Sequence, residues 1–311
     1  MKVFVTGVGG QLGHDVMNEL HKRGHEGVGS DIAPQYSGAQ DGTAVTAMPY
    51  VPLDITDVAA VSRVLRQVRP DAVVHCAAWT AVDAAEEPEN QPKVRAINAD
   101  GTANIAEVCR ELDCKMVYIS TDYVFNGQGE TPWQPDCKDY APLNFYGQTK
   151  LEGELAVSSR LEKYFIVRIA WVFGLNGKNF IKTMLKLGET HDTLRVVNDQ
   201  IGTPTYTLDL SRLLVDMIET EKYGYYHATN EGGYISWYDF ACAIFKASGM
   251  NVTVQPVTTA EYGESTAKRP FNSRLDKSKV TDNGFQPLPD WHDALERYVG
   301  NTQGEGMRRN G

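Results

Sequence analysis

The sequence predicts an α/β protein: a doubly wound parallel sheet, followed in the chain by a smaller C-terminal lobe. Three observations point to this fold class. Short apolar runs alternate with segments of helical periodicity through the first half of the chain. The run AVVHC at residues 72–76 is almost wholly apolar, as expected of a parallel strand that is covered on both faces. A glycine-rich segment, residues 7–13, joins the first strand to the first helix.

The alternation places the elements of the sheet domain in order. Strands are expected at residues 2–6, 27–31, 72–76, 116–120 and 165–170, with a short strand just before Asp54. Helices are expected at residues 11–23, 57–68, 99–112 and 145–161. The first helix has Leu12, Val16 and Leu20 on one face, which gives it an apolar side to pack on the sheet. Residues 33–49 are rich in Gly, Ser and Thr and are expected to form a loop.

After about Trp171 the pattern changes to shorter strands and longer loops. Helices are expected at residues 179–187, 208–219 and 237–247, with short strands at 196–197 and 225–228. We assign residues 1–175 and 205–232 to the sheet domain, and residues 176–204 and 233–299 to the smaller lobe. Residues 300–311 are rich in Gly and lack apolar periodicity, so a disordered tail is expected there.

Composition excludes several classes of partner. Among 311 residues, Lys and Arg number 30 and Asp and Glu number 40, so the net charge is −10. This balance argues against binding a nucleic-acid backbone or an anionic membrane surface. The sequence has no apolar run long enough to span a bilayer and begins with a strand pattern rather than a signal peptide. The five Cys and seven His lack metal-ligand spacing, so we expect a reduced, cytoplasmic protein and assign no metal.

The glycine-rich segment predicts a dinucleotide-binding loop. Its spacing is Gly7-x-x-Gly10-x-x-Gly13, placed between a strand and a helix. Glycines allow a tight turn and let a pyrophosphate approach the backbone, and the helix N-terminus attracts its negative charge. The alternative is a purely structural turn. The context favours a Rossmann-type domain that binds NAD(P).

Two acidic residues are expected to contact the adenosine half of that cofactor. Asp31 ends the second strand, where a carboxylate accepts hydrogen bonds from the ribose hydroxyls of NAD and repels the 2′-phosphate of NADP. Asp31 is followed by a long, flexible loop that is able to rearrange, so both NADH and NADPH remain open. Asp54, after the third short strand, is placed to bind the adenine.

Three residues form a candidate catalytic group. Tyr146 and Lys150 lie four residues apart and therefore on one helical face, where the ammonium is expected to lower the pKa of the phenol. Thr121 ends a parallel strand, at the edge where such sheets bind ligands. The pattern predicts an acid/base for a carbonyl or an alcohol. The alternatives are an ordinary helix surface pair for Tyr146 and Lys150, and a turn-capping hydroxyl for Thr121.

Longer motifs extend this pattern along most of the chain. They are GVGGQLG (7–13), AAWTAVDAAE (77–86), STDYVF (120–125), PLNFYGQTKLEGE (142–154), RIAWVFG (168–174), NDQIGTPT (198–205) and RPFNSRL (269–275). In these strings and their order, residues 1–299 resemble the extended short-chain dehydrogenase/reductases. More narrowly, the chain resembles the dTDP-4-dehydrorhamnose reductase family.

The resemblance implies a role for each matching residue. Thr121, Tyr146 and Lys150 match the catalytic group, and Lys150 also holds the nicotinamide ribose together with Tyr146. Cofactor-binding positions are Gly7, Gly10, Gln11, Leu12, Gly13, Asp31, Asp54, Ala77, Ala78 and Thr80. Substrate-binding positions, besides Thr121, are Val82, Asp83, Asp122, Tyr123, Trp171, Asn179, Arg269, Asn272 and Arg274. Guanidinium groups such as those of Arg269 and Arg274 suit a diphosphate, and Trp171 suits a sugar face, although core packing is an alternative for Trp171.

The activity implied by the resemblance is reduction of the C4 ketone of dTDP-4-dehydro-β-L-rhamnose to dTDP-L-rhamnose with NADPH or NADH. Two alternatives stay open. One is a reductase of another nucleotide-linked 4-keto-6-deoxyhexose, and the other is a non-catalytic, NADP-binding regulatory subunit. A monomer or a homodimer is expected, and no Mg²⁺ site is assigned.

Overall fold

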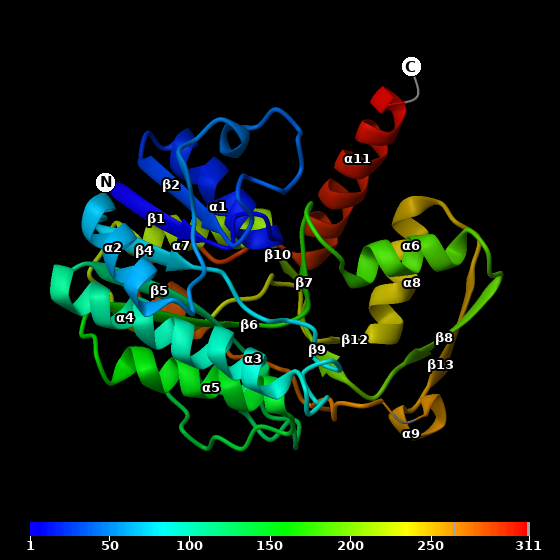
Figure 1. Ribbon diagram of the computed structural model, residues 1–311. Coiled ribbons are helices and arrows are strands. Elements are labelled where there is room, and N and C mark those ends of the chain that lie inside the picture. The colour runs from blue at the N-terminus through cyan, green and yellow to red at the C-terminus, as the bar shows by residue number, and fades with distance from the viewer. Residues whose placement is uncertain (264, 310–311) are drawn as a thin grey trace.

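The structure is a computed structural model that describes residues 1–263 and 265–309. Its centre is a seven-stranded sheet, parallel throughout, in the order β11-β6-β5-β4-β1-β2-β3 (Figure 1). The strands are β1 (Lys2–Thr6), β2 (Glu26–Asp31), β3 (Tyr50–Pro52), β4 (Ala72–His75), β5 (Lys115–Thr121), β6 (Tyr164–Ile169) and β11 (Gly224–His227). The order reverses beside β1, so the prediction of a doubly wound sheet is confirmed.

Helices cover both faces of this sheet (Figure 1). Helices α1 (Gln11–Lys22) and α7 (Thr207–Ile218) share one apolar core with Val3, Val5 and Val74. On the opposite face, α2 (Val58–Val68), α4 (Gly101–Leu112) and α5 (Phe145–Ser158) share another core with Phe4 and Val73. Consecutive residues of β1 point to opposite faces, which is why both cores draw on the same apolar strand.

One helix begins earlier than the sequence predicts. The turn of α3 (Gln91–Arg95) runs into a π-helical turn, Ala96–Asp100, and then into α4. The expected start at residue 99 therefore falls inside the π-helical turn. A π-helical turn adds a residue to the helical repeat, so the 3.6-residue periodicity that marks the start of a helix is lost there.

A second group of elements packs beside the carboxyl edge of the sheet. It contains α6 (Phe180–Gly188), α8 (Trp237–Ser248) and α11 (Trp291–Arg309), with short α9 (Thr259–Tyr262). Short α10 (Ser278–Asp282) instead packs against β11 and contributes Val280 to the core shared by α1 and α7. Its strand pairs are β8 (Thr193–Val197) with β13 (Thr253–Val257), β7 (Val172–Phe173) with β10 (Thr205–Tyr206), and β9 (Ile201–Gly202) with β12 (Ile235–Ser236). Helices α6, α8 and α11 share an apolar core that includes Ile181, Phe240 and Leu295.

The C-terminal segment differs from the expected tail. Helix α11 continues through residues 300–309, and residues 310 and 311 lie outside the described part of the chain. Within residues 1–263 and 265–309, no helix combines the length and the apolarity needed to cross a bilayer.

Candidate functional site

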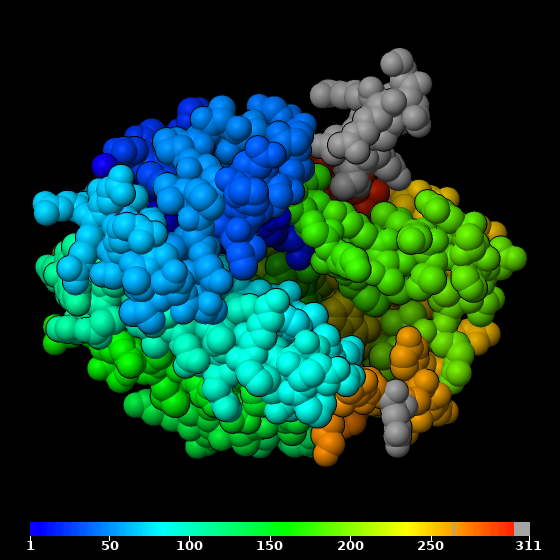
Figure 2. All heavy atoms as spheres, in the orientation of Figure 1, coloured from blue at the N-terminus to red at the C-terminus, as the bar shows by residue number. Residues whose placement is uncertain are grey.

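A cleft of about 1050 Å³ lies at the carboxyl edge of the central sheet. It is lined by the ends of β1, β2, β4 and β5 and, across from them, by residues around Trp171 and Trp237. Figure 2 shows the molecule hollowed between the blue and cyan N-terminal residues and the green and orange residues that follow. Open α/β sheets bind their ligands at this edge, next to the point where the strand order reverses.

The glycine loop forms one end of the cleft, and close packing explains its glycines. Gly7 has φ +70°, and a Cβ added to it would lie 2.7 Å from the backbone nitrogen of Ala77. A Cβ on Gly13 would lie 2.3 Å from the carbonyl oxygen of Gly7. No side chain caps the N-terminus of α1, whose first residues, Gln11 and Leu12, line the cleft with Gly10. The loop therefore fits a pyrophosphate, which needs close backbone approach and free N–H groups.

Both predicted adenosine-binding carboxylates line the cleft, as do Ala77, Ala78 and Thr80 beyond β4. Asp31 accepts a hydrogen bond from the Gly9 N–H (3.0 Å) on Oδ2 and one from the Ile32 N–H (2.8 Å) on Oδ1. Asp54 Oδ1 accepts from the N–H and the hydroxyl of Thr56, at 2.9 and 2.7 Å. Asp31 is thus held rigidly at the end of β2, while Asp54 mainly closes its own turn.

Two serines of the cleft, to which no role was predicted, have buried hydroxyls. Among the described residues, the Oγ atoms of Ser30 and Ser120 are buried without a hydrogen-bond partner. Both residues line the cleft. Buried polar atoms are nearly always paired, so these hydroxyls are consistent with a polar ligand in the cleft.

Helix α5 brings Tyr146 and Lys150 to Thr121. The helix begins after Asn144, whose Oδ1 accepts from the Gly147 N–H at 2.8 Å. Gly147 allows close contact with the turn after β5, because a Cβ there would lie 2.3 Å from the carbonyl oxygen of Tyr123. Thr121, Tyr146 and Lys150 all line the cleft. The structure therefore brings the three predicted catalytic residues together.

The electrostatics of this group differ from the sequence expectation. Lys150 Nζ donates to the carbonyl oxygen of Ile119 at 2.7 Å and lies 4.2 Å from the centre of the Tyr118 ring. Burial lowers the pKa of Lys150 to about 7. Burial and the charge of Asp122 raise the pKa of Tyr146 above its ordinary value, and hydrogen bonding to Thr121 offsets this only in part. The expected lowering of the Tyr146 pKa by Lys150 is thus not seen, because desolvation dominates both groups.

Asp122 lies at the centre of this arrangement. It is 2% exposed, and burial raises the pKa of its carboxyl to about 6. The Thr121 hydroxyl donates to Asp122 Oδ1 at 2.9 Å and accepts from the Tyr123 N–H at 3.2 Å. While Asp122 is ionised, the single proton of the Thr121 hydroxyl therefore points to the carboxylate.

Six of the ten predicted substrate residues line the cleft, and one of them, Arg269, is paired with Asp83, a predicted residue that does not. Val82, Asp122, Tyr123, Trp171 and Arg269 are lining residues. The guanidinium of Arg269 donates to both carboxylate oxygens of Asp83, at 2.6 and 3.1 Å. Trp171 has φ 52°, which is unusual for a bulky residue, and its ring stacks on Trp237 with centroids 3.8 Å apart. Trp237 also lines the cleft, although no predicted motif contains it.

Besides Asp83, three predicted substrate residues do not line the cleft: Asn179, Asn272 and Arg274. Asn179 is buried, caps α6 through Oδ1, and donates from Nδ2 to Gln11 Oε1 at 3.0 Å and to the Tyr298 hydroxyl at 3.1 Å. Asn272 donates to the carbonyl oxygens of Gln128 and Thr131, and its Oδ1 accepts from Arg274. All three residues hold loops in place, and the structure gives them no position on the cleft wall.

Two residues outside the predicted set of site residues support the catalytic helix. Asn98, in the π-helical turn, donates to Thr149 Oγ1 at 3.1 Å and accepts from the Trp79 N–H at 2.8 Å. Glu86 Oε1 accepts from the Phe145 N–H at 2.6 Å, at the N-terminus of α5. A polar residue inside a helix, such as Asn98, was the available signal, because Asn is disfavoured there without a specific partner. Within the described residues, no group of three or more His, Cys, Asp or Glu side chains is arranged to hold a metal ion.

Comparison with known proteins finds similarity to the dTDP-4-dehydrorhamnose reductases over almost the whole chain. The family model described as "RmlD substrate binding domain" matches residues 1–303. The dTDP-4-dehydrorhamnose reductase of Streptomyces griseus is 38% identical over 94% of this chain and 91% of its own length. The crystal structure of a dTDP-4-dehydrorhamnose reductase from Clostridium acetobutylicum has TM-score 0.87 and 40% identity, covering 97% of this chain and 100% of that chain. The Bacillus anthracis reductase, solved in complex with NADP, has TM-score 0.83 and 37% identity, covering 97% and 99%.

Proposed function

The chain belongs to the RmlD substrate binding domain family, and on that premise we propose that it reduces the C4 ketone of dTDP-4-dehydro-β-L-rhamnose to dTDP-L-rhamnose. It is an NAD(P)-dependent oxidoreductase. The observation that carries the proposal is a single cleft with the glycine loop at one end and Thr121, Tyr146 and Lys150 at the other. A dinucleotide and a ketone that occupy this cleft together are brought into reacting distance.

The cofactor end of the cleft holds the dinucleotide through backbone and acidic groups. Gly7, Gly10 and the N-terminus of α1 bind the pyrophosphate, and Asp31 binds the adenosine ribose. Lys150 binds the nicotinamide ribose with Tyr146. The bound reduced nicotinamide supplies the hydride that adds to C4 of the sugar.

Tyr146 donates the proton to the sugar O4 as the ketone becomes an alcohol. The raised pKa of Tyr146 keeps this proton in place at neutral pH, as a general acid requires. Lys150 follows one helical turn later and stabilises the phenolate that remains. Thr121 hydrogen-bonds the same oxygen when its own proton is not drawn to Asp122.

The far wall of the cleft binds the nucleotide-sugar. Arg269 lines the cleft and is held by Asp83, and the N–H groups of its guanidinium that do not bond Asp83 bind the diphosphate. Trp171 presents one ring face while Trp237 covers the other, which suits stacking on the pyranose or the thymine.

The decisive assay follows absorbance at 340 nm with dTDP-4-dehydro-β-L-rhamnose and reduced cofactor. We expect turnover, and we expect Tyr146→Phe to lower kcat by about 100-fold or more while cofactor affinity changes little. Tyr262→Phe, on a residue that is 60% exposed, is the matched control and should keep full activity.

The alternatives give different results in the same assay. Higher kcat/KM with a UDP- or GDP-linked 4-keto-6-deoxyhexose would replace the proposed substrate. No turnover with any ketosugar, together with a stoichiometric partner protein, would favour a regulatory subunit. An active Tyr146→Phe variant would refute the assigned role of the phenol.

A further inference from the structure

We propose that Asp122 supplies the proton that replaces the one Tyr146 gives to the sugar, and that the Thr121 hydroxyl passes this proton on. The inference rests on the proposed reduction and adds to it a residue that acts through Thr121 at each turnover. Three features carry it: the hydrogen bonds among the three residues, the burial of the Asp122 carboxyl, and the charged groups around it.

The three side chains form one chain of hydrogen bonds. The Thr121 hydroxyl donates to Asp122 Oδ1 at 2.9 Å and lies within hydrogen-bonding reach of the Tyr146 phenol. The backbone fixes this hydroxyl, because it also accepts from the Tyr123 N–H at 3.2 Å. A hydroxyl has a single proton, so Thr121 can give its proton to Tyr146 only if it receives another from its second neighbour. That second neighbour is Asp122.

The ionisation of Asp122 decides which way the protons of this chain point. When the carboxyl is ionised, the Thr121 proton is directed to Oδ1, and the Tyr146 phenol can donate to Thr121 rather than to the sugar. When the carboxyl is protonated, it can donate to Thr121 across the same 2.9 Å, and both hydroxyl protons are then free to point into the cleft. The protonated form is therefore the one that supports proton transfer to the sugar O4.

The surroundings of Asp122 favour this protonated form. The side chain is almost fully buried and, among the described residues, no hydrogen bond of ordinary geometry reaches its Oδ2. An ionised carboxylate with an unpaired oxygen is costly in such a place, whereas a protonated carboxyl is neutral. Burial accordingly raises the pKa of the Asp122 carboxyl to about 6, although the hydroxyls of Ser273 and Thr121 favour the ionised form. A group with this pKa gains and loses a proton readily near neutral pH.

The charged groups near Asp122 are bonded to other partners. The titratable groups on the elements packed against it are the phenols of Tyr123 and Tyr146, the Lys150 ammonium, and the guanidinium groups of Arg269 and Arg274. The ammonium donates to a backbone carbonyl, and the two guanidinium groups donate to Asp83 and Asn272. Burial raises the pKa of both phenols, so neither is ionised at neutral pH. Within the described residues, no ion pair therefore holds Asp122 in its ionised form.

The proton transfers balance over one turnover. The hydride adds to C4 of the sugar, and the O–H bond of Tyr146 breaks as the O4–H bond forms, which leaves a phenolate. The Thr121 hydroxyl gives its proton to this phenolate and receives the proton of Asp122, so both hydroxyls are restored. Asp122 is left as a carboxylate and regains a proton from water that enters the cleft it lines. The net reaction consumes one hydride and one proton from solvent.

The test compares the first turnover with later ones, by stopped-flow absorbance at 340 nm with the full chain, reduced cofactor and dTDP-4-dehydro-β-L-rhamnose. Asp122→Asn keeps the shape of the side chain, and its amide can donate to Thr121 but cannot release a proton. Because Tyr146 begins protonated, we expect this variant to convert about one equivalent within about threefold of the unchanged rate, and then to slow at least about tenfold. Equal loss in the first and later turnovers, or no loss in either, would overturn the proposal.

The pH dependence is a second readout that a structural role would not change. The steady-state rate of the unchanged chain should fall as the pH rises through about 6, because the protonated carboxyl is the form that supplies the proton. The rate of Asp122→Asn should not change over this range, and Thr121→Ser, which keeps the hydroxyl, should keep the dependence. Asp136→Asn, on a carboxylate that is 71% exposed, is the matched control and should alter neither readout.

The outcomes separate this proposal from the proposed function. A pH profile shared by the unchanged chain and Asp122→Asn would refute the transfer through Thr121 while leaving the reduction itself intact. Absence of turnover in the unchanged chain would contradict both the reduction and the proton supply that rests on it.

Discussion

The buried ion pair between Arg168 and Glu154 is expected to fix the catalytic helix on the sheet. Arg168 lies on β6 and Glu154 on α5, one helical turn after Lys150. Both side chains are 0% exposed, and two parallel hydrogen bonds of 2.8 Å join them. Loss of one partner therefore leaves a buried charge without its counter-charge.

The size of the effect follows from this burial. Removing one partner of a buried pair costs about 3–5 kcal/mol, because the remaining charge keeps its desolvation penalty. We therefore expect Glu154→Leu and Arg168→Met each to lower the free energy of unfolding by about this amount. The double variant should recover much of the loss, since no unpaired charge remains.

Urea unfolding followed by tryptophan fluorescence measures these changes. The matched control is the exposed pair of Arg66 and Glu111, whose side chains are 58% and 35% exposed. Arg66→Met should cost less than about 1 kcal/mol. Equal, small losses in the buried and exposed single variants would refute the argument that this pair fixes α5.

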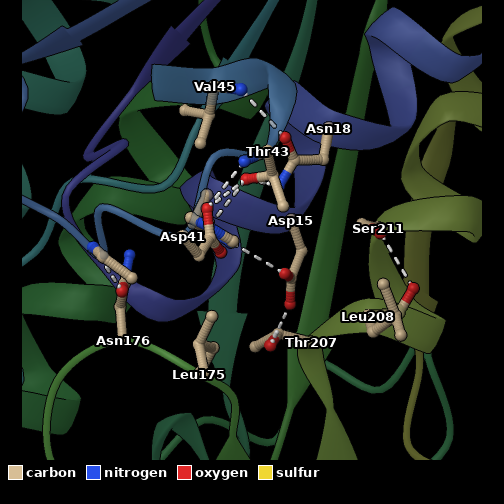
Figure 3. A network of polar contacts seen from close by, with 12 residues as sticks. Asp15, Asn18, Asp41, Thr43, Val45, Leu175, Asn176, Thr207, Leu208 and Ser211 are labelled. Carbon is tan, nitrogen blue, oxygen red and sulfur yellow. Dashed lines mark hydrogen bonds and ion pairs between the residues drawn. The ribbon is translucent and has the colours of Figure 1, made fainter. Parts of the chain in front are cut away.

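Three further predictions concern the packing and charge of the site. Gly147→Ala should lower kcat at least tenfold and also lower the midpoint of thermal unfolding, because its Cβ would meet the Tyr123 carbonyl oxygen at 2.3 Å. Asp122→Asn should reduce turnover yet stabilise the protein at pH 8 by up to about 3 kcal/mol. Because the pKa of the Asp122 carboxyl is raised to about 6 in the folded protein, this group favours folding at pH values below its pKa in the unfolded chain, and the contribution is lost as the pH rises through 6. Chemical unfolding at pH 5 and at pH 8 measures this loss of stability. Burial opposes the charged form of His14, but Asp15 and Asp41 raise the pKa of His14 overall. His14 lies between these two carboxylates, and Asp41 accepts from the hydroxyl of Thr43 in the loop after β2 (Figure 3). The contribution of His14 to stability is therefore fully present at pH values below its pKa in the unfolded chain, and it is lost as the pH rises through its pKa in the folded protein. Amide-exchange protection at Ala39 and Val45 should therefore fall above that pH, and His14→Gln should abolish this dependence.

The sequence predicts the fold correctly where the apolar pattern of a segment matches the residues that are buried in the structure. The apolar strands and the stripe of Leu12, Val16 and Leu20 all lie in the cores they were expected to form. The π-helical turn at residues 96–100 was not predictable, because it is stabilised by contacts of Asn98 with distant residues. Helix α11 also extends beyond the point where its apolar pattern ends.

The sequence predicts which residues belong to the site better than it predicts their contacts and orientations. Motifs placed Thr121, Tyr146 and Lys150 in one cleft, because parallel strands direct their carboxyl ends to one edge. Motifs do not reveal whether a polar side chain faces a ligand or its own loop, which is why they predict Asn179 and Asn272 as substrate residues although both hold loops. Nor does the spacing of Tyr146 and Lys150 disclose how strongly burial changes their pKa values.

The most direct test of the central claim follows the hydride and the proton in one experiment. The chain is incubated with dTDP-4-dehydro-β-L-rhamnose and reduced cofactor that carries deuterium at the transferring C4 position of the nicotinamide. We predict a dTDP-L-rhamnose product with deuterium at C4 of the sugar, formed at least about 100-fold more slowly by Tyr146→Phe. A product without deuterium at C4, or one formed as fast by Tyr146→Phe, would contradict the account.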